Sequence, residues 1–360
     1  MTQPDQIDTP QAAQPAHASA PRIESLHPAC AMPMASIDVL GANLGPVANH
    51  LPIVSADDEA ALVLMSRPSR ISLRVPADAS TGMLEIRNPF GTSNAVPLRV
   101  ARKLTDGLHP ITSPAVSASG MIFTTISGPR GTQTPVSIVR VSPDGRGTPF
   151  VSEILNASGL AFNPAGDLFV TSRAEGIVYT VDAAGQTAVY AEGMGVATGA
   201  AFDANGDLFV GDRSGTIFRI NAERQIFVHA TLEPSVSAYH LAVTAENELL
   251  VTGPSLTSND TVWLIDHAGD KRVFYKGLGR PQGLAIDAEG DVYVTASLHG
   301  QRGVVRITRK LNERSERKAE LVVAGQNLVG IAFSPLGTAI LATNQAIYEI
   351  DLGVEGLRLF

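Results

Sequence analysis

Few side chains in this 360-residue sequence have the spacing that catalysis or metal binding requires. His27, His50 and His109 show no spacing typical of a metal site. The single cysteine, Cys30, excludes both an intramolecular disulfide and a cysteine-based zinc site. The sequence also lacks a Gly-x-Ser-x-Gly turn, a phosphate-binding loop and a dinucleotide-binding fingerprint. These observations argue against hydrolase, nucleotide and redox chemistry and favour a binding function.

The candidate contact residues recur at one position of a repeat, immediately before a short apolar strand. They are small or neutral apart from one aromatic ring, and they comprise Ser113, Ser158, Thr198, Tyr239, Gln282 and Val329. Side chains of this kind are typical of a binding funnel rather than of a hydrolytic centre. His240, beside Tyr239, stands where the other repeats have a small residue. Two interpretations of it stay open: a hydrogen-bonded plug of the central channel, or a ligand contact.

A second group of candidates lies in loops expected at the same face of the fold. Arg173, Asp212 and Arg213 belong to short loops, and His299 belongs to the longer loop 297–303. Polar loops on one face of a rigid scaffold are common recognition sites. An ion pair between Asp212 and Arg213 that merely fixes its loop is the alternative, and His299 is equally compatible with an exposed position that has no function.

Six similar segments position these residues at intervals of about 43 residues, which is the length of a propeller blade. Each segment contains a four-residue turn that opens with a side chain able to bond the backbone and closes with Gly or Asn. The turns are Ser117–Gly120, Asn163–Gly166, Asp203–Gly206, Thr244–Asn247, Asp287–Gly290 and Ser334–Gly337. Unbroken apolar runs follow the turns, which predicts strands buried on both faces. Four strands in each of six repeats predict a six-bladed β-propeller over residues 105–360.

The first strand of most repeats is rich in Gly and Ala, as at Gly159, Gly199 and Gly283. This composition is expected where six inner strands crowd around one axis. Two segments could complete the ring, and the sequence leaves both open. One is the C-terminal Gly356–Phe360, and the other is a strand near Leu98–Leu104.

The N-terminal part of the chain has a different pattern. Residues 1–20 are rich in Gln, Pro, Ala and Thr and are expected to form a disordered lead. Residues 21–104 contain short apolar runs broken by turns, with no helical period, which predicts an Ig-like β-sandwich. We therefore expect an all-β protein with an N-terminal Ig-like β-sandwich followed by the six-bladed β-propeller.

Charge and hydropathy restrict the partners. The formal net charge of −8 argues against a nucleic-acid partner, which requires a basic face. No apolar run reaches the ~18 residues of a membrane-spanning helix, and the first residues lack the basic and apolar regions of a secretory signal. We expect a small molecule or a protein as partner at the propeller mouth, no membrane insertion, and by default a cytoplasmic monomer.

Two family resemblances refine this interpretation. Val39-Leu-Gly-Ala-Asn-Leu-Gly45 and Asn88-Pro-Phe-Gly-Thr-Ser-Asn94 resemble turns of the IPT/TIG domain, which implies an Ig-like interaction or spacer domain. Pro-Gln-Gly-Leu-Ala-Ile-Asp-Ala-Glu-Gly-Asp-Val-Tyr-Val, residues 281–294, resembles NHL-repeat and SMP-30/gluconolactonase-like propellers. The resemblance implies a bacterial protein of the gluconolactonase-like type, and such domain pairs often work outside the cytoplasm.

The SMP-30 resemblance also implies one divalent cation, such as Ca²⁺, held by Glu, Asn and Asp at the channel mouth. The matching positions here are Thr112–Pro114, Ser158–Ala161 and Pro281–Gly283, and none carries a carboxylate. We therefore expect no metal, no cofactor and no catalytic residue, and a ligand- or protein-binding propeller with an Ig-like spacer. The alternative is a metal-dependent gluconolactonase-like lactonase or esterase that holds its Ca²⁺ with an unrecognised ligand set.

Overall fold

The computed structural model describes residues 19–257, 259–311, 313–314 and 316–359, which fold into strands joined by turns. These residues contain 33 strands and no helix, so the all-β prediction is confirmed. Accordingly, the described ranges offer no helix that could cross a membrane. The predicted lead, residues 1–20, lies outside the described residues except for its last two.

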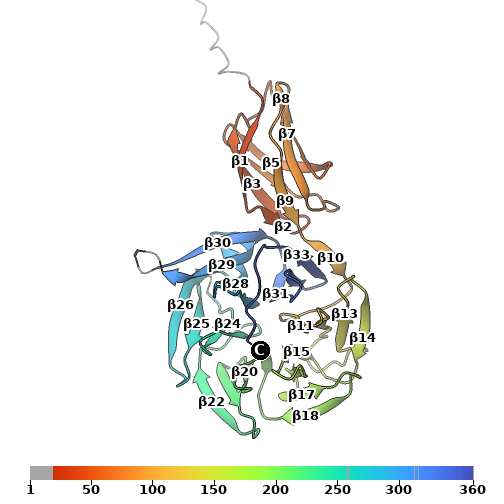
Figure 1. Ribbon diagram of the computed structural model, residues 1–360, viewed down its shortest axis with the longest axis vertical. Helices are drawn as coiled ribbons and strands as arrows, with labels where there is room; N and C mark the ends of the chain where they lie inside the picture. The colour runs from red at the N-terminus through yellow and green to blue at the C-terminus, as the bar shows by residue number, and fades with distance from the viewer. Residues whose placement is uncertain (1–18, 258, 312, 315, 360) are drawn as a thin grey trace, which may run out of the picture.

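Five four-stranded antiparallel sheets are arranged as blades around a common axis (Figure 1). Four of them use consecutive strands: β11 (Ala115–Val116), β12 (Ile122–Thr125), β13 (Ile138–Val141) and β14 (Gly147–Val151); β15 (Ala157–Phe162), β16 (Leu168–Ser172), β17 (Ile177–Val181) and β18 (Thr187–Ala191); β19 (Ala197–Phe202), β20 (Leu208–Asp212), β21 (Thr216–Ile220) and β22 (Ile226–Thr231); β23 (His240–Val243), β24 (Leu249–Thr252), β25 (Asp260–Ile265) and β26 (Lys271–Leu278). The fifth combines β31 (Leu328–Phe333), β32 (Ala339–Thr343) and β33 (Ile347–Ile350) with β10 (Arg102–Thr105). The β-propeller prediction is therefore confirmed.

The prediction of six separate four-stranded blades is wrong for the fifth repeat. Its strands are β27 (Leu284–Ile286), β28 (Val292–Leu298), β29 (Gln301–Leu311) and β30 (Arg317–Ala324), and they pair in this order without forming a sheet of their own. The short strand β2 (Cys30–Ala31) pairs in parallel with both β30 and β9 (Val96–Val100). An outer strand presents unpaired backbone groups, and β2 uses those of β30. This bridge makes one 13-stranded sheet of the fifth repeat and the N-terminal strands.

The N-terminal strands form a lobe beside the ring (Figure 1). Besides β2 and β9, they are β1 (Arg22–His27), β3 (Ser36–Ala42), β4 (Ile53–Ala56), β5 (Glu59–Arg67), β6 (Arg70–Arg74), β7 (Gly82–Asn88) and β8 (Gly91–Thr92). Their order is β1-β3-β6-β5-β4-β7-β9-β2, and β8 pairs with β7. The strands of this lobe continue through β2 into the fifth repeat.

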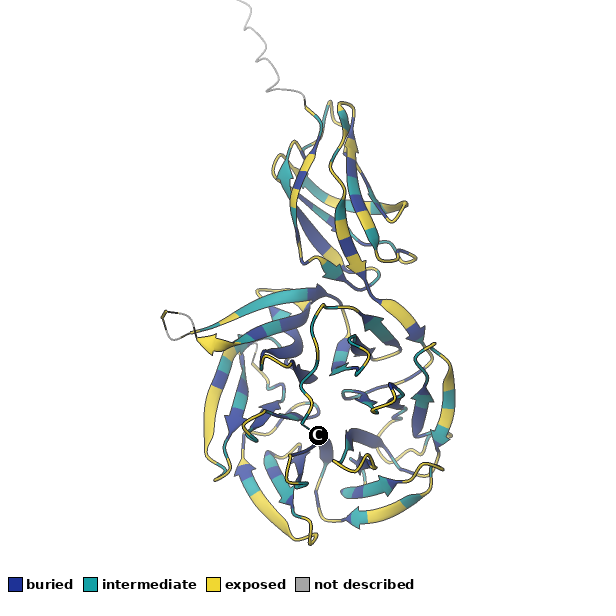
Figure 2. Cartoon of the chain, viewed as in Figure 1, coloured by how far each residue is buried: buried dark blue, intermediate teal, exposed yellow. Residues whose placement is uncertain are grey.

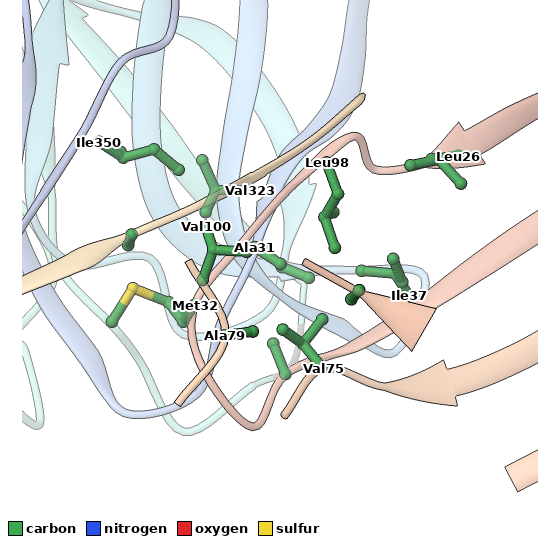
Figure 3. Close-up of a cluster of buried hydrophobic side chains, with 14 of the residues drawn as sticks. Leu26, Ala31, Met32, Ile37, Val75, Ala79, Leu98, Val100, Val323 and Ile350 are labelled. Atoms are coloured by element: carbon green, nitrogen blue, oxygen red, sulfur yellow. The ribbon is translucent and has the colours of Figure 1, made fainter. Parts of the chain in front are cut away.

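The lobe and the ring share an apolar core at this junction (Figure 3). Ala31 and Val323 have no exposed surface, and Met32 and Val100 are almost fully buried. The amide of Met32 donates to the carbonyl of Ala324 at 2.7 Å and continues the pairing of β2 with β30. Apolar burial and strand pairing both stabilise the docked position. The lobe is therefore fixed on the ring by both backbone pairing and apolar packing.

The six repeated turns have the predicted geometry. Their last residues all have positive φ, from 63° at Asn247 to 88° at Gly166. In each turn the amide of the last residue donates to the carbonyl of the first, as Gly206 does to Asp203 at 3.1 Å. Gly and Asn adopt this conformation more readily than other residues, which explains why they close these turns. The hairpin register predicted from the sequence is confirmed.

Strand β10 closes the ring. It pairs antiparallel with β33, with Arg102 opposite Glu349, and it buries Leu104 against the blade core. The C-terminal tail runs to the inner strand β27 instead, where the amide of Leu357 donates to the carbonyl of Ile286 at 2.9 Å. Of the two candidate segments, the one before residue 105 therefore supplies the closing strand.

Candidate functional site

Six inner strands meet at the axis and leave little space there. β11, β15, β19, β23, β27 and β31 contact one another in ring order, and the strands nearest the axis are buried (Figure 2). A Cβ atom on Gly159 would lie 2.1 Å from the carbonyl oxygen of Thr198. The axial cavity that remains has a volume of about 30 Å³ and is lined in part by Thr112, Ser113 and His240. This volume admits a water molecule but no organic ligand.

His240 is a buried side chain that lines the axial cavity. It is 3% exposed, and neither Nδ1 nor Nε2 has a hydrogen-bond partner among the described residues. Burial lowers the pKa of His240 to about 3, because a charged imidazole would lose its hydration. The position agrees with the plug interpretation, but the hydrogen bonds to protein groups that this interpretation included are not seen.

We expect His240 to make the fold sensitive to acid. A histidine in the unfolded chain titrates near 6.5, so a falling pH protonates the unfolded chain before it protonates the folded protein. The stability linked to His240 is complete above that pH and is lost as the pH falls toward 3. The loss between pH 7 and pH 5 is about 2 kcal/mol.

Urea unfolding across this pH range measures the effect. The variant His240→Leu has no titrating group at the axis, so its free energy of unfolding should decline less steeply with pH than that of the wild type. Equal pH dependences in the two proteins would show that His240 is not the acid-sensitive group.

Three of the other predicted funnel residues, Ser158, Thr198 and Tyr239, are buried. The hydroxyl of Thr198 donates to the carbonyl of Gly211 at 2.9 Å and accepts the amide of Tyr239 at 3.0 Å. The hydroxyl of Tyr239 donates to the carbonyl of Glu233, and burial raises the pKa of Tyr239 to about 12. Ser158 has no exposed surface, and its Oγ lacks a hydrogen-bond partner in the described ranges. Thr198 and Tyr239 therefore join neighbouring blades.

A cavity large enough for a ligand lies beside the axis, between the fifth repeat and the sheet that β10 closes. Its volume is about 530 Å³, which suits a small molecule. One part of the lining is formed by Gly279, Arg280 and Gln282 and by the end of β28. Gly279 and Ser297 exchange two backbone hydrogen bonds of 2.8 Å there. Residues 327–329, at the start of β31, form another part of the lining. We call this space the mouth cavity.

The polar lining of the mouth cavity is neutral or positive. It consists of Gln282, Thr295, Ser297, Asn327 and Asn344 together with two arginines, Arg280 and Arg302. No carboxylate and no histidine belongs to the lining among the described residues. Such a surface offers hydrogen bonds and positive charge, but it lacks the acid–base groups that hydrolysis uses.

Only two predicted residues, Gln282 and Val329, line the mouth cavity, while Ser113 and His240 line the axial one. The repeat pattern did not indicate Arg280, Asn327 or Asn344, because none of them occupies the repeated position that the predicted funnel residues share. The length of loop 297–303 could have indicated a binding residue, since this loop supplies Arg302 to the cavity lining.

The predicted loop residues lie at neither cavity, and three of them, Arg173, Asp212 and Arg213, are bonded to protein groups. Asp212 accepts the amide of Val196 at 2.8 Å and the hydroxyl of Ser214. Arg213 donates to the carbonyl of Val236 at 3.2 Å, and no ion pair between Arg213 and Asp212 is seen in the described ranges. The alternative of an ion pair is thus not what fixes this loop: a backbone amide and the Ser214 hydroxyl bond Asp212, and a backbone carbonyl bonds Arg213.

The remaining two loop residues are also away from the cavities. Arg173 donates from Nη2 to the carbonyl of Gly128 at 2.8 Å. Burial, together with the positive charges of Arg213 and Arg130, lowers the pKa of Arg173. His299 is exposed at the tip of the hairpin between β28 and β29.

The side chains at the channel mouth do not fit a divalent cation. The hydroxyl of Thr112 donates to the carbonyl of Ser158 at 2.7 Å, and the amide of Ile331 donates to the hydroxyl of Ser113 at 3.3 Å. The described residues contain no group of three or more His, Cys, Asp or Glu side chains that could hold a metal ion. A Ca²⁺-like ion prefers carboxylate oxygens, and none faces the axis at these positions.

No protein-family profile matches the chain, and no curated protein does. Solved structures do match. A protein of unknown function from Bacteroides thetaiotaomicron VPI-5482 is 14% identical, with a TM-score of 0.55, over 96% of this chain and 100% of that chain. A protein provisionally named a gluconolactonase is 18% identical, with a TM-score of 0.57, over 72% of this chain and 93% of that chain.

A third match is an auxiliary nutrient binding protein from Bacteroides thetaiotaomicron VPI-5482. It is 11% identical, with a TM-score of 0.53, over 92% of this chain and 97% of that chain. This likeness shows the fold alone. The chain has the architecture of gluconolactonase-like propellers, and identities this low carry no activity from one protein to another.

Proposed function

We propose that this chain is a propeller that binds a small molecule in the mouth cavity. The observation that carries the proposal is the composition of the lining: amides, hydroxyls and guanidinium groups surround about 530 Å³ without any carboxylate or histidine. A concave site with convergent polar groups is the usual form of a small-molecule site. The nutrient binding protein among the structural matches is consistent with a binding role.

The proposal includes a finer assignment of the fold. We take β27–β30 as a sixth blade of an NHL- or SMP-30-like propeller over residues 105–360, because six inner strands contact one another in ring order. We take residues 21–104 as an Ig-like lobe of the IPT/TIG type. The lobe supports the mouth cavity: Gln301 Nε2 lies 3.5 Å from Asp38 Oδ2, and Met32 packs against Gly325 in the cavity wall.

A thermal-shift screen of neutral, anionic and cationic small molecules tests the binding function. Compounds that raise the melting temperature of the wild type should fail to do so in Asn344→Trp, because the indole would occupy the cavity. Asn205→Trp, in an exposed turn of another blade, is the matched control and should respond like the wild type. If no compound stabilises the protein, or if Asn344→Trp responds like the wild type, the proposal is wrong.

The alternative, a metal-dependent lactonase, predicts a different response. Calcium, zinc or manganese would stabilise a protein that binds it, in proportion to the logarithm of its concentration. Since the donor set does not fit such an ion, we expect no rise in the melting temperature with any of the three. A rise of several degrees that a chelator reverses, together with lactone hydrolysis above the rate in buffer, would support the lactonase instead.

A further inference from the structure

We infer that the ligand of the mouth cavity is a small organic anion, bound through its carboxylate or phosphate group by Arg280 and Arg302. The inference rests on the proposed function and specifies its ligand class. Both arginines line the cavity, and neither guanidinium group has a hydrogen-bond or ion-pair partner among the described residues. By contrast, Arg306 of the fifth repeat and Arg272 of the blade β23–β26 form ion pairs. Arg306 Nε lies 2.8 Å from Asp291 Oδ2, and Arg272 Nη2 lies 2.8 Å from Glu248 Oε1.

Charge around the cavity favours an anion. The protein carries a formal net charge of −8, yet the cavity lining contains two cations and no carboxylate within the described ranges. The nearby carboxylate of Asp260 does not belong to the lining. It is 4% exposed, and its oxygens accept hydrogen bonds from the backbone amides of Ser255 at 3.0 Å and Arg280 at 3.2 Å. A guanidinium group can bind a carboxylate or phosphate through two parallel hydrogen bonds.

The backbone at Arg280 gives an independent argument. Arg280 has φ of 49° and precedes Pro281, and both a positive φ and a following proline restrict an ordinary residue. The loops before β15, β19 and β31 also contain a residue with positive φ, and these residues are Asn156, Gly195 and Asn327. Asn and Gly tolerate this conformation. Arginine adopts it less readily. Arg224 does so where it closes a hairpin turn, whereas Arg280 does so before a proline and with no protein acceptor for its guanidinium group, which points to a functional position.

The rest of the lining indicates the body of the ligand. Gln282, Thr295, Ser297, Asn327 and Asn344 offer amide and hydroxyl groups that both donate and accept hydrogen bonds. These groups suit a hydroxylated carbon chain or ring. A sugar acid or a sugar phosphate combines such a body with the required anionic group.

Calorimetric titration of the full chain with gluconate, glucose 6-phosphate and glucose tests the inference. Gluconate and glucose 6-phosphate distinguish a carboxylate from a phosphate, and glucose is the neutral control. We expect at least one anion to bind, more weakly as sodium chloride is added, and glucose to show no comparable binding. Arg280→Asn and Arg302→Gln should each weaken the anion by roughly 10- to 100-fold.

Two controls keep the test independent of folding. Arg280→Asn relieves the strained backbone, so its melting temperature should equal or exceed that of the wild type while binding is lost. Arg67→Asn removes the same charge from an exposed position in the lobe and should leave anion binding unchanged.

The inference is overturned if neither anion binds at millimolar concentration, if glucose binds as tightly as the anions, or if both cavity variants bind like the wild type. It fails alone if the screen finds a neutral compound whose binding Asn344→Trp abolishes. It fails together with the proposed function if no compound binds in the mouth cavity at all.

Discussion

Replacing Gly159 with valine should prevent folding or lower the free energy of unfolding by at least about 4 kcal/mol. Gly159 lies in the inner strand β15, where a Cβ would be 2.1 Å from the carbonyl oxygen of Thr198 and 2.9 Å from the amide nitrogen of Ala200. Both atoms belong to the backbone of β19, so neither can move without shifting a neighbouring blade. Urea unfolding followed by circular dichroism measures the loss.

Gly206→Val separates crowding from backbone strain. Gly206 closes the turn after β19 with φ of 87°, and a Cβ there would meet no atom within 4 Å. The strain of a branched residue at positive φ should cost about 1–3 kcal/mol, clearly less than the change at Gly159. If the two variants lost the same stability, crowding of the inner strands would not be what requires glycine at the axis.

The second large effect concerns the strand that closes the ring. A chain that begins at residue 106 lacks β10, whereas a chain that begins at residue 102 keeps it, and both lack the lobe. Removing β10 takes away its pairing with β33 and exposes the core that Leu104 covers. We expect the shorter chain to be less stable by at least about 3 kcal/mol, which lowers the melting temperature by about 6–12 °C.

Scanning calorimetry of the two truncated chains measures this difference. The comparison is matched, because the interface exposed by loss of the lobe is the same in both proteins. Equal melting temperatures would mean that β10 is dispensable and that the ring is closed by the contacts of the C-terminal tail with β27 alone.

The local features of the fold were predictable because they depend on residues close in sequence. A turn such as Asp203–Gly206 requires only a bonding side chain at its start and a residue that tolerates positive φ at its end. The crowding at Gly159 was also predictable, since six copies of one pattern must converge on one axis. The sequence did not reveal which predicted funnel residues would be buried. The amide of Tyr239 donates to the hydroxyl of Thr198 in the neighbouring blade, and no local sequence pattern specifies this contact.

By itself, the sequence determined the β-propeller class, the repeat length, the six hairpin turns and the neutral character of the channel mouth. Only the tertiary structure decided which strand closes the ring, how the lobe docks and where a ligand fits. The reason is that these features depend on residues far apart in the sequence. Arg102 forms an ion pair of 2.6 Å with Glu349, and Cys30 pairs with Val323 in adjacent strands. Such contacts, like the meeting of Arg280 with Arg302 at one cavity, depend on how whole blades pack, and local spacing does not encode that packing.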